Sequence, residues 1–514
     1  MHYTKAAIVS IASFLCSLLA AAQPDFNKTY DFDGPGLWFV NLLADNDTLV
    51  LYGFGQDTSS PPKQGLYFVR MDSLGNVINS VFHADTTGGY FFLDYGFDII
   101  RLSDGRYGGV GGLSGARTFL AVFGRTGEME MLKTMNDPTV LFTSLRKVIE
   151  LDDGFLLGGY KQKQNFSLDM FILKTDKLGN KLWEKSYGAS NENDFLGTLT
   201  RLDDNTYVIG ASRQKTSNLP LNQFWARSRI LAIDSLGTIK WDWSSALNKG
   251  GGIRGLHQTE DGGWIYCTGE FDVNLVENWL DTRPKIVMRD SSMNLVWEEV
   301  MEVGKVYLNS FMDMKPSPDG YWVGAGFWTL PFDDVTNAEL YGGLCKISPA
   351  GEVCWLRTDS SEWSIGAGKA ANYYGGLAML SSGSIVAAGR SERLLPSPSK
   401  DFAWVVKVDQ GGNTNTLCLF SNAEELMGGR QLPTVTAYPN PANDHIVFTL
   451  SGTMAGDDPH LVLFNPAGQR IANISFGSTQ STTLDTASLP TGLYFYRLTL
   501  KTGASFSGKI IIQH

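Results

Sequence analysis

The sequence predicts an all-β protein, a seven-bladed β-propeller followed by a small Ig-like β-sandwich at the C-terminus. First, a strand–turn–strand unit with Asp, Gly and Trp at fixed places recurs along most of the chain. Second, an acidic-glycine turn and a short apolar strand precede each copy of that unit. Third, 56 glycines and 12% aromatic residues in 514 residues suit a protein with many turns that is too long for one ordinary core.

The clearest copy of the turn unit is Phe171–Trp183. Its first arm is β-branched and aromatic, which suits a half-buried strand. Asp176 can accept hydrogen bonds from a type I turn, and Gly179 can take the left-handed conformation at the fourth position. Trp183 then lies on the returning strand, where its ring can pack against a neighbouring sheet. The unit recurs at Asp72/Gly75, Asp234/Gly237/Trp241, Asp290/Asn294/Trp297, Ser348/Gly351/Trp355, Asp409/Gly412 and, in degenerate form, Gly124/Gly127.

The second marker stands before each turn unit, for example at Asp153–Gly159 and Asp204–Gly210. A further short strand precedes each marker, such as Arg146–Leu151. This arrangement gives four strands per unit and seven units, which repeat about every 50–60 residues, a spacing typical of propeller blades. One such sheet cannot bury both of its faces, so we expect the sheets to stack radially into a ring.

Residues 1–22 have the pattern of a secretory signal peptide, with Lys5, an apolar run from Ala6 to Leu19, and then alanines. The run has about 14 residues, too few to cross a bilayer, and no later segment approaches the length of a transmembrane helix. The propeller is then predicted to occupy residues 23–420.

The predicted mature N-terminus looks like a fourth strand that lacks the rest of its blade. Asp25–Trp38 aligns with Leu182–Phe195, so that Phe26 matches Trp183 and Tyr30 matches Tyr187. We expect this strand to complete the last sheet beside Trp404–Val408, which would close the ring and cover an exposed edge. The competing strand for that place is Thr414–Phe420.

Four cysteines follow the predicted signal peptide: Cys267, Cys345, Cys354 and Cys418. Cys345 and Cys354 flank one turn, and with a plain two-residue loop they would face each other and could form a disulfide. If Gly351 instead forms a one-residue bulge, the register shifts and the two side chains point to opposite faces. Small buried thiols are then expected.

The connections between strands predict where ligands bind. Tight turns fall on one face of the ring and long loops on the other, and elaborated loops on a rigid scaffold usually carry function. The long loops hold the candidate ligand-binding residues Trp225, Trp279, Trp328 and Trp363. Solvent-facing indoles would suit sugar rings or peptide side chains, whereas buried ones would only attach the loops to the scaffold.

The innermost strands carry a row of residues, six positions before each second marker, that alternation predicts to face a central channel. The row is Asn41, Asp98, Lys147, Thr198, Gly255, Asp313 and Gly376, with Arg254 at the rim. Asp98, Lys147 and Asp313 are candidates for a ligand or ion site, or they line a water-filled channel. Asp98 and Asp313 would also be the carboxylate pair of a glycosidase or lyase.

Composition and motifs argue against several function classes. A net charge of -11 disfavours nucleic acid, whose phosphates need clusters of Lys and Arg. The sequence has no GxSxG or HExxH motif, and its histidines are scattered. The segment 45–47 begins like a calcium loop but lacks the Gly and Glu that such a loop needs, so no metal and no other cofactor is predicted.

The repeat pattern stops after Phe420. Residues 421–433 form a polar linker, and residues 434–514 contain short alternating runs separated by turns. A segment of about eighty residues with six or seven such strands fits a small β-sandwich.

Four motifs stand in this segment in order: Ala437–Leu450, Leu461–Ile471, Ser488–Leu498 and Lys509–Gln513. They resemble the C-terminal sorting domain of the type IX secretion system of Bacteroidetes-type Gram-negative bacteria. The resemblance implies the following motif residues: Tyr438, Pro439, Asn440 and Pro441 at the opening of the domain, Gly468 in a hairpin, Gly492 and Tyr494 at the penultimate strand, and Lys509 in the last motif. It also implies secretion, recognition by the type IX machinery at the outer membrane, and release or attachment at the cell surface.

The turn units resemble two propeller signatures, the Asp-box hairpin of sialidase-like propellers and the quinoprotein-type repeat, as in Ile230–Trp241. Asp-boxes have one fewer residue between Asp and Gly. In both families the Trp-bearing turn is structural, so the resemblance implies no catalytic activity.

The sequence therefore predicts a secreted or cell-surface propeller that binds a glycan or a protein through its long-loop face. One alternative is a secreted enzyme of the glycoside hydrolase or lyase type that acts on extracellular polysaccharide. Another is a structural part of a surface assembly without a small ligand.

Overall fold

The computed structural model describes residues 25–514 except 33–35, 60–61, 86–90, 93–96, 190–191, 216–224, 275–278, 302, 304–308, 330–339, 362–369, 394–399, 413–433, 452–459, 466–469, 477–480 and 500–504. The chain divides into two compact units, Met1–Thr416 and Leu417–His514. The predicted signal peptide, residues 1–22, and the predicted linker, residues 421–433, lie outside the described residues, so both stay predictions. Among the residues described, we find no helix with the length and apolar character needed to cross a bilayer.

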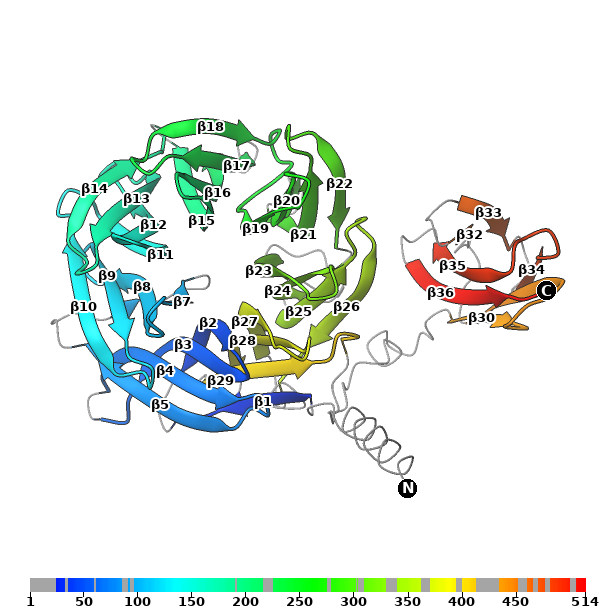
Figure 1. Ribbon diagram of the computed structural model, residues 1–514, viewed down its shortest axis with the longest axis horizontal. Helices are drawn as coiled ribbons and strands as arrows, with labels where there is room; N and C mark the ends of the chain where they lie inside the picture. Colours follow the sequence, from blue (N-terminus) through cyan, green and yellow to red (C-terminus); the bar gives the residue numbers. More distant parts are fainter. Residues whose placement is uncertain are drawn as a thin grey trace, which may run out of the picture. The chain divides into compact units, whose positions relative to one another are not determined.

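The first unit is a ring of β-sheets around a central axis, which confirms the predicted propeller (Figure 1). Within the described residues, the strand pairings divide into seven sets of four neighbouring strands, which we number blades 1 to 7 along the chain. Three sets depart slightly from this plan, and one of them has a fifth strand. In blade 2 both β6 and β7 pair with β8, and a single parallel pairing of Leu340 with Ala371 joins blades 6 and 7.

The strands of the first three blades follow one another along the chain. Blade 1 is β2 (Trp38–Asp45), β3 (Thr48–Gln56), β4 (Gln64–Asp72) and β5 (Val77–Ala84). Blade 2 is β6 (Phe91–Phe92), β7 (Ile99–Arg101), β8 (Tyr107–Leu113), β9 (Arg117–Phe123) and β10 (Met129–Asn136). Blade 3 is β11 (Phe142–Leu151), β12 (Gly154–Gln162), β13 (Leu168–Asp176) and β14 (Lys181–Ser186).

The remaining blades continue in the same order. Blade 4 is β15 (Glu192–Asp203), β16 (Thr206–Lys215), β17 (Ala226–Ile233) and β18 (Ile239–Ser244). Blade 5 is β19 (Arg254–Gln258), β20 (Trp264–Asn274), β21 (Trp279–Arg289) and β22 (Leu295–Val300). Blade 6 is β23 (Ser310–Pro316), β24 (Trp322–Thr329), β25 (Leu340–Ile347) and β26 (Val353–Asp359), and blade 7 is β27 (Ala370–Met379), β28 (Ile385–Arg393), β29 (Lys400–Val408) and β1 (Phe26–Tyr30).

The N-terminal strand β1 is the fourth strand of blade 7. It pairs antiparallel with β29, from Phe26 opposite Lys407 to Tyr30 opposite Ala403. The indole Nε1 of Trp404 also donates to Oδ1 of Asn27 at 2.7 Å. The structure therefore confirms the prediction that the N-terminal strand pairs beside Trp404–Val408. The competing strand, residues 414–420, lies outside the described residues.

The turn units have the expected local geometry. The carboxylate of Asp176 accepts hydrogen bonds from the backbone N–H groups of Leu178 and Asn180 at 2.9 and 2.8 Å, and Gly179 has a φ of 75°. In the copy at Asp290, the expectation that Asn294 takes the place of this glycine is wrong. The turn sets the third residue after Asp in the left-handed region, and that residue is Met293, with a φ of 68°.

Cys345 and Cys354 do not form a disulfide. A bulge follows Lys346 in the pairing of β25 with β26, so Cys345 lies opposite Leu356, and Cys354 points to the other side of the sheet. Cys345 is fully buried, and this burial raises the pKa of its thiol to about 12. The bulged alternative is therefore the correct one for this turn.

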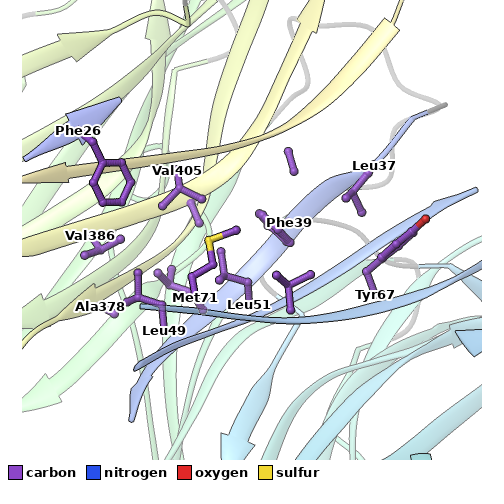
Figure 2. Close-up of a cluster of buried hydrophobic side chains, with 14 of the residues drawn as sticks. Phe26, Leu37, Phe39, Leu49, Leu51, Tyr67, Met71, Ala378, Val386 and Val405 are labelled. Atoms are coloured by element: carbon purple, nitrogen blue, oxygen red, sulfur yellow. The ribbon is translucent and has the colours of Figure 1, made fainter. Parts of the chain in front are cut away.

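Each blade buries its two faces against its neighbours. Between blades 7 and 1, buried side chains of β1, β28 and β29 meet side chains of β2, β3 and β4 in one apolar cluster (Figure 2). Phe26, Val386 and Val405 lie on one side of this cluster and Leu51 and Met71 on the other (Figure 2). Burial of apolar area between blades stabilises the ring, because no single sheet has a core of its own.

The second unit contains two facing sheets with one apolar core. One sheet has the order β30 (Thr434–Tyr438), β31 (His445–Ser451), β34 (Ser481–Asp485). The other has the order β33 (Arg470–Ser475), β32 (His460–Phe464), β35 (Gly492–Thr499), β36 (Ser505–Ile512). Phe448 and Ile446 from the first sheet share the core with Leu461, Tyr496 and Ile510 from the second. The predicted small β domain is confirmed.

Candidate functional site

The innermost strands of six blades, all except blade 2, show a β-bulge near their start in the described residues. The register shifts between Phe39/Asn41, Leu145/Lys147, Leu196/Thr198, Arg254/His257, Phe311/Asp313 and Tyr374/Gly376. A bulge bends a strand and re-aims the side chain beside it. Five members of the predicted inner row stand directly after such a bulge, and two of them, Asn41 and Asp313, reach a residue of the next blade with their side chains.

Asp98 links three blades. Its Oδ1 accepts a hydrogen bond from Nδ2 of Asn41 in blade 1 at 3.1 Å, and the Nζ of Lys147 in blade 3 lies 3.8 Å from the same oxygen. Its Oδ2 accepts from the backbone N–H of Val148 at 3.4 Å. Burial raises the pKa of Asp98, and the nearby Lys147 ammonium opposes that shift.

Asp313 repeats this arrangement between blades 6 and 7. Its Oδ1 accepts from the backbone N–H of Met314 at 2.9 Å, and its Oδ2 accepts from the backbone N–H of Leu377 at 3.3 Å. Lys315 lies 3.4 Å from Oδ2 and also donates to the backbone oxygen of Leu377. The structure thus brings Asp98 to Lys147 and Asp313 to Lys315, and both carboxylates act as bridges between inner strands.

Two polar residues of this inner region escaped the sequence analysis. Lys315 and His257 stand two positions after the predicted row, on β23 and β19. The ring nitrogen Nε2 of His257 lies 2.7 Å from the backbone oxygen of Met314, and burial lowers the pKa of the imidazole. A search for polar residues two positions further along each inner strand would have found both.

Arg254 lies at the start of β19, where its Nη1 is 3.5 Å from the backbone oxygen of Gly197 in blade 4. Its side chain is half-buried. Within the described residues, no three His, Cys, Asp or Glu side chains group as ligands for a metal ion.

The four candidate tryptophans have different surroundings. Trp328 is fully buried in β24, where its Nε1 donates to Oγ1 of Thr358 at 3.1 Å, so the buried alternative holds for this ring and it is not exposed for ligand binding. The side chain of Trp328 points into the core, and its ring fills the space where a side chain on Gly343 would lie. Trp225 is half-buried under the guanidinium of Arg227, 5.3 Å from the ring centre. Trp279 begins β21, with its side chain not described, and Trp363 lies outside the described residues.

A cluster that the sequence analysis missed lies at the ends of blades 6, 7 and 1 on the long-loop face. We call it the rim cluster, and it consists of Trp38, Phe54, Phe327, Tyr373 and Arg390. The guanidinium carbon of Arg390 is 5.0 Å from the ring centre of Trp38 and 5.7 Å from that of Tyr373. Phe327 packs edge-on against Tyr373 at 5.0 Å, and Phe54 lies 5.3 Å from Trp38.

Carboxylates border the rim cluster. Glu392 pairs with Arg390, and Oδ1 of Asp401 lies 2.8 Å from the Nε of Arg390. Burial raises the pKa of Asp401, while the Arg390 guanidinium opposes the shift. The sequence signal for this cluster is an aromatic residue three positions before the inner row, which holds for Trp38 and Tyr373.

The residues of the sorting motif hold the ends of the second unit together. The backbone N–H of Ile511 donates to Oδ1 of Asn440 at 2.8 Å. Gly492 begins β35, and the buried Tyr494 donates its hydroxyl to the backbone oxygen of Pro490 at 2.9 Å. Lys509 lies opposite Phe495 in the pairing of β36 with β35, while Gly468 lies outside the described residues.

Residues 436–513 match the model of the family described as the secretion system C-terminal sorting domain. This match confirms the predicted type IX sorting domain at the C-terminus. A chain with this domain is secreted or displayed at the cell surface, and the domain interacts with the secretion machinery. No curated protein matches the chain.

Solved structures resemble the chain only distantly. A puromycin hydrolase mutant has 11% identity and a TM-score of 0.45, with 80% of this chain and 58% of that chain covered. The GH93 α-L-arabinofuranosidase of Fusarium graminearum has 12% identity and a TM-score of 0.39, with 62% and 97% covered. The polysaccharide lyase Uly1 has 9% identity and a TM-score of 0.42, with 72% and 90% covered. The chain thus spans 58% of the length of the hydrolase, and similarity this low says nothing about its activity.

Proposed function

We propose that this secreted propeller is a binding or adhesion module that holds a glycan over its long-loop face, with a protein ligand as the second possibility. The observation that carries the proposal is the rim cluster. Three neighbouring blades bring aromatic rings and one arginine to the same end of the ring, and Trp38, Tyr373 and Arg390 are only half-buried there.

The chemistry of the rim cluster suits sugars. Aromatic faces pack against the apolar faces of sugar rings, and planar carboxylate and guanidinium groups beside them can bond to hydroxyls. Arg390, Glu392 and Asp401 supply such groups next to Trp38 and Tyr373. Half-buried rings of this kind also lose little conformational entropy when a ligand arrives, because packing already orders them.

Trp225 supplies a second aromatic platform for this proposal. It lies just before β17, the third strand of blade 4, on the same face, and stacks with Arg227. Trp279 and Trp363 remain proposed members of the binding face. Asp98, Lys147, Arg254 and Asp313 lie deeper, along the inner strands, and we propose them only as polar lining beneath the ligand.

The enzyme alternative rests on one observation, the raised pKa of Asp98. A carboxyl with a raised pKa can serve as a general acid. Against it, Asp98 and Asp313 both accept backbone N–H groups of neighbouring inner strands. Those contacts support a structural use of the same oxygens, which favours the binding proposal.

The test is a glycan array probed with the purified full chain and matched variants. Arg390→Ala and Trp38→Ala should each weaken the strongest signals about tenfold or more, as loss of a central interface residue does. Arg106→Ala is the matched control, because Arg106 also pairs with two carboxylates, Asp104 and Glu130, but stands at a tight turn on the opposite face. Equal binding by all three variants would refute the proposal.

A separate assay addresses the enzyme alternative. The full chain would be incubated with polysaccharides, and released sugars would be measured for the wild type, Asp98→Asn and Asp313→Asn. The binding proposal predicts no turnover by any of them. Turnover that one of these folded variants loses would establish the alternative instead.

A further inference from the structure

Phe166 combines an exposed aromatic ring with a strained backbone. Its side chain is 62% exposed, in the hairpin that joins β12 to β13 in blade 3. Its φ is 65°, in the left-handed region, where a bulky residue is a genuine outlier. Backbone strain of this kind concentrates at positions that hold ligands. The ring therefore needs an explanation outside the fold.

The hairpin has the same backbone as the turn units of the opposite face. The N–H of Lys163 donates to the oxygen of Ser167, and the N–H of Phe166 donates to the oxygen of Lys163, both at 2.9 Å. Phe166 thus stands where Gly179 stands in the turn unit of the same blade. Met293 also replaces that glycine, but it packs against an apolar cluster. Phe166 belongs to none of the apolar clusters formed by the described residues, so packing does not account for its ring.

Amide side chains and one further apolar side chain surround Phe166. Leu141 is 42% exposed, and its backbone N–H donates to the oxygen of Gln162 at 2.8 Å. The amide of Gln162 in turn donates to the backbone oxygen of Phe166 at 3.4 Å. Gln164 and Asn165 are exposed and directly precede Phe166. Amides donate and accept hydrogen bonds as sugar hydroxyls do, and an aromatic ring packs on the apolar face of a sugar, so this chemistry favours a glycan over a protein.

The hairpin lies on the long-loop face. It joins the second and third strands of blade 3, as the connection that carries Trp225 does in blade 4. The backbone N–H of Leu168, at the start of β13, donates to Oδ1 of Asn193 at 3.0 Å, which ties the base of the hairpin to blade 4. In a ring of seven blades, the place opposite blade 3 is the boundary of blades 6 and 7, where Phe327 and Tyr373 of the rim cluster meet (Figure 1).

We propose that Phe166 is a second glycan subsite, so that the ligand is an extended polysaccharide chain that runs across the long-loop face from the rim cluster to blade 3. A long chain contacts both sites at once, whereas a short oligosaccharide contacts only one. Linked contacts of this kind raise the affinity without changing either site. This inference rests on the proposed function and adds the length of the ligand to it.

The experiment measures the affinity of the purified full chain for the disaccharides and hexasaccharides of cellulose, chitin, xylan and arabinan. The wild type should prefer the hexasaccharide of the series that it binds. Phe166→Ala should weaken binding of that hexasaccharide about tenfold, as loss of an aromatic contact does, and leave binding of the disaccharide unchanged. Phe166→Tyr keeps the ring and should bind like the wild type. Leu178→Ala is the matched control, because Leu178 is 69% exposed in the turn unit of the same blade on the opposite face.

Phe166→Gly adds a readout that distinguishes binding from folding. Glycine accepts a positive φ, so this variant should have a higher urea midpoint than the wild type while its affinity for the hexasaccharide falls. A lower midpoint would assign the ring to the fold instead.

The outcomes separate this inference from the proposed function. Unchanged hexasaccharide binding by Phe166→Ala, together with weakened binding by Arg390→Ala, would overturn the second subsite and keep the rim cluster. Equal affinity of the wild type for both lengths, or binding to none of the four series, would also overturn the inference. The proposed function would still be decided by Arg390→Ala on the full glycan array.

Discussion

The seam that closes the ring, between blades 7 and 1, repeats the contacts of an internal seam, between blades 3 and 4. Tyr30 on β1 donates its hydroxyl to the backbone oxygen of Gly75 at 2.8 Å, and Tyr187, just after β14, donates to that of Gly237 at 2.8 Å. In both seams the glycine belongs to the turn unit of the following blade and has a positive φ, 78° at Gly75 and 74° at Gly237.

The two seams differ in how their outer strand is held. β14 continues directly from β13 through a tight turn, whereas β1 has no turn to β29 and depends on pairing and packing alone. The closing seam also buries its anchor more deeply, since Phe26 is 5% exposed and Trp183 is half-buried. The comparison teaches that deeper packing replaces a covalent connection where the ring closes.

The largest expected difference concerns these two anchors. Phe26→Ala should lower the free energy of unfolding by about 3–5 kcal/mol, the usual cost of removing a buried aromatic ring. Trp183→Ala should cost about half as much, because its ring is only half-buried and a turn still holds its strand. Urea denaturation of the full chain measures both, and a larger loss in Trp183→Ala would contradict the comparison.

The next largest effect is expected at Gly75 and Gly237, the turn glycines that the two seam tyrosines contact. A methyl group at Gly75 would lie 2.7 Å from Cζ of Phe26, and one at Gly237 would lie 2.9 Å from the hydroxyl of Tyr187. Gly320 has a φ of 82° with nothing within 4 Å of such a methyl group, so it is the control.

Gly320→Ala should cost about 1–2 kcal/mol, the strain of the left-handed conformation alone. Gly75→Ala and Gly237→Ala should cost more, because their neighbours must also move. Thermal or urea denaturation distinguishes these effects, and equal losses in all three variants would show that the seam contacts add nothing.

A smaller effect is expected at the two tyrosines. Tyr30→Phe and Tyr187→Phe each remove a donor to a turn carbonyl, with an expected cost of about 1 kcal/mol. Burial raises the pKa of both hydroxyls, which therefore remain neutral donors at ordinary pH. The two losses should agree, because the two hydrogen bonds have the same length. A marked difference in urea midpoints would mean that the seams are not energetic copies.

The smallest effect concerns the turn carboxylates, Asp72 under the closing seam and Asp234 under the internal one. At Asp72, burial favours a higher pKa, but hydrogen bonds from Asn76 and Leu74 outweigh it and the pKa is lowered. At Asp234 the backbone N–H of Thr238 is the main cause of a lowered pKa.

A pKa lowered by folding gives stability that is fully present above the ordinary value of about 4 and is lost as the pH falls through the folded value. Asp72→Asn and Asp234→Asn should therefore melt below the wild type at pH 7 and approach it at pH 3. Melting curves at both values test this, and an unchanged gap at pH 3 would exclude the carboxylate charge as the cause.

The sequence predicted those parts of the fold that depend on local chemistry. Asp176 and Gly179 identify their turn because few residues bond to their own backbone or accept a positive φ. The match of Phe26 and Tyr30 with Trp183 and Tyr187 located β1 correctly. A fourth strand has the same residue pattern whether it stands at the N-terminus or follows the third strand of its own blade. Met293 was missed because the turn geometry overrides residue preference.

The candidate site was harder to predict, since it depends on three-dimensional contacts. Alternation suggested that Asp98 and Asp313 face a channel, but each carboxylate accepts a backbone N–H of the next blade, from Val148 and Leu377, and at Asp313 a bulge in β23 precedes the residue. Trp328 was taken for a loop residue because a long loop follows it, although it still belongs to β24. The rim cluster forms only when blades 6, 7 and 1 meet, so the aromatic residues three positions before the inner row, Trp38 and Tyr373, give a signal only once their blades are known to be neighbours.

The pairing of β1 with β29 sets the moment at which folding can finish. Asn27 and Trp404, joined by a side-chain hydrogen bond, are 377 residues apart in the chain. During synthesis the first strand emerges long before its partner exists, and it waits unpaired until almost the whole ring has been translated. A truncated product that ends before Lys400 lacks β29, so β1 has no partner and the ring cannot close. Only a chain synthesised through β29 can therefore finish folding.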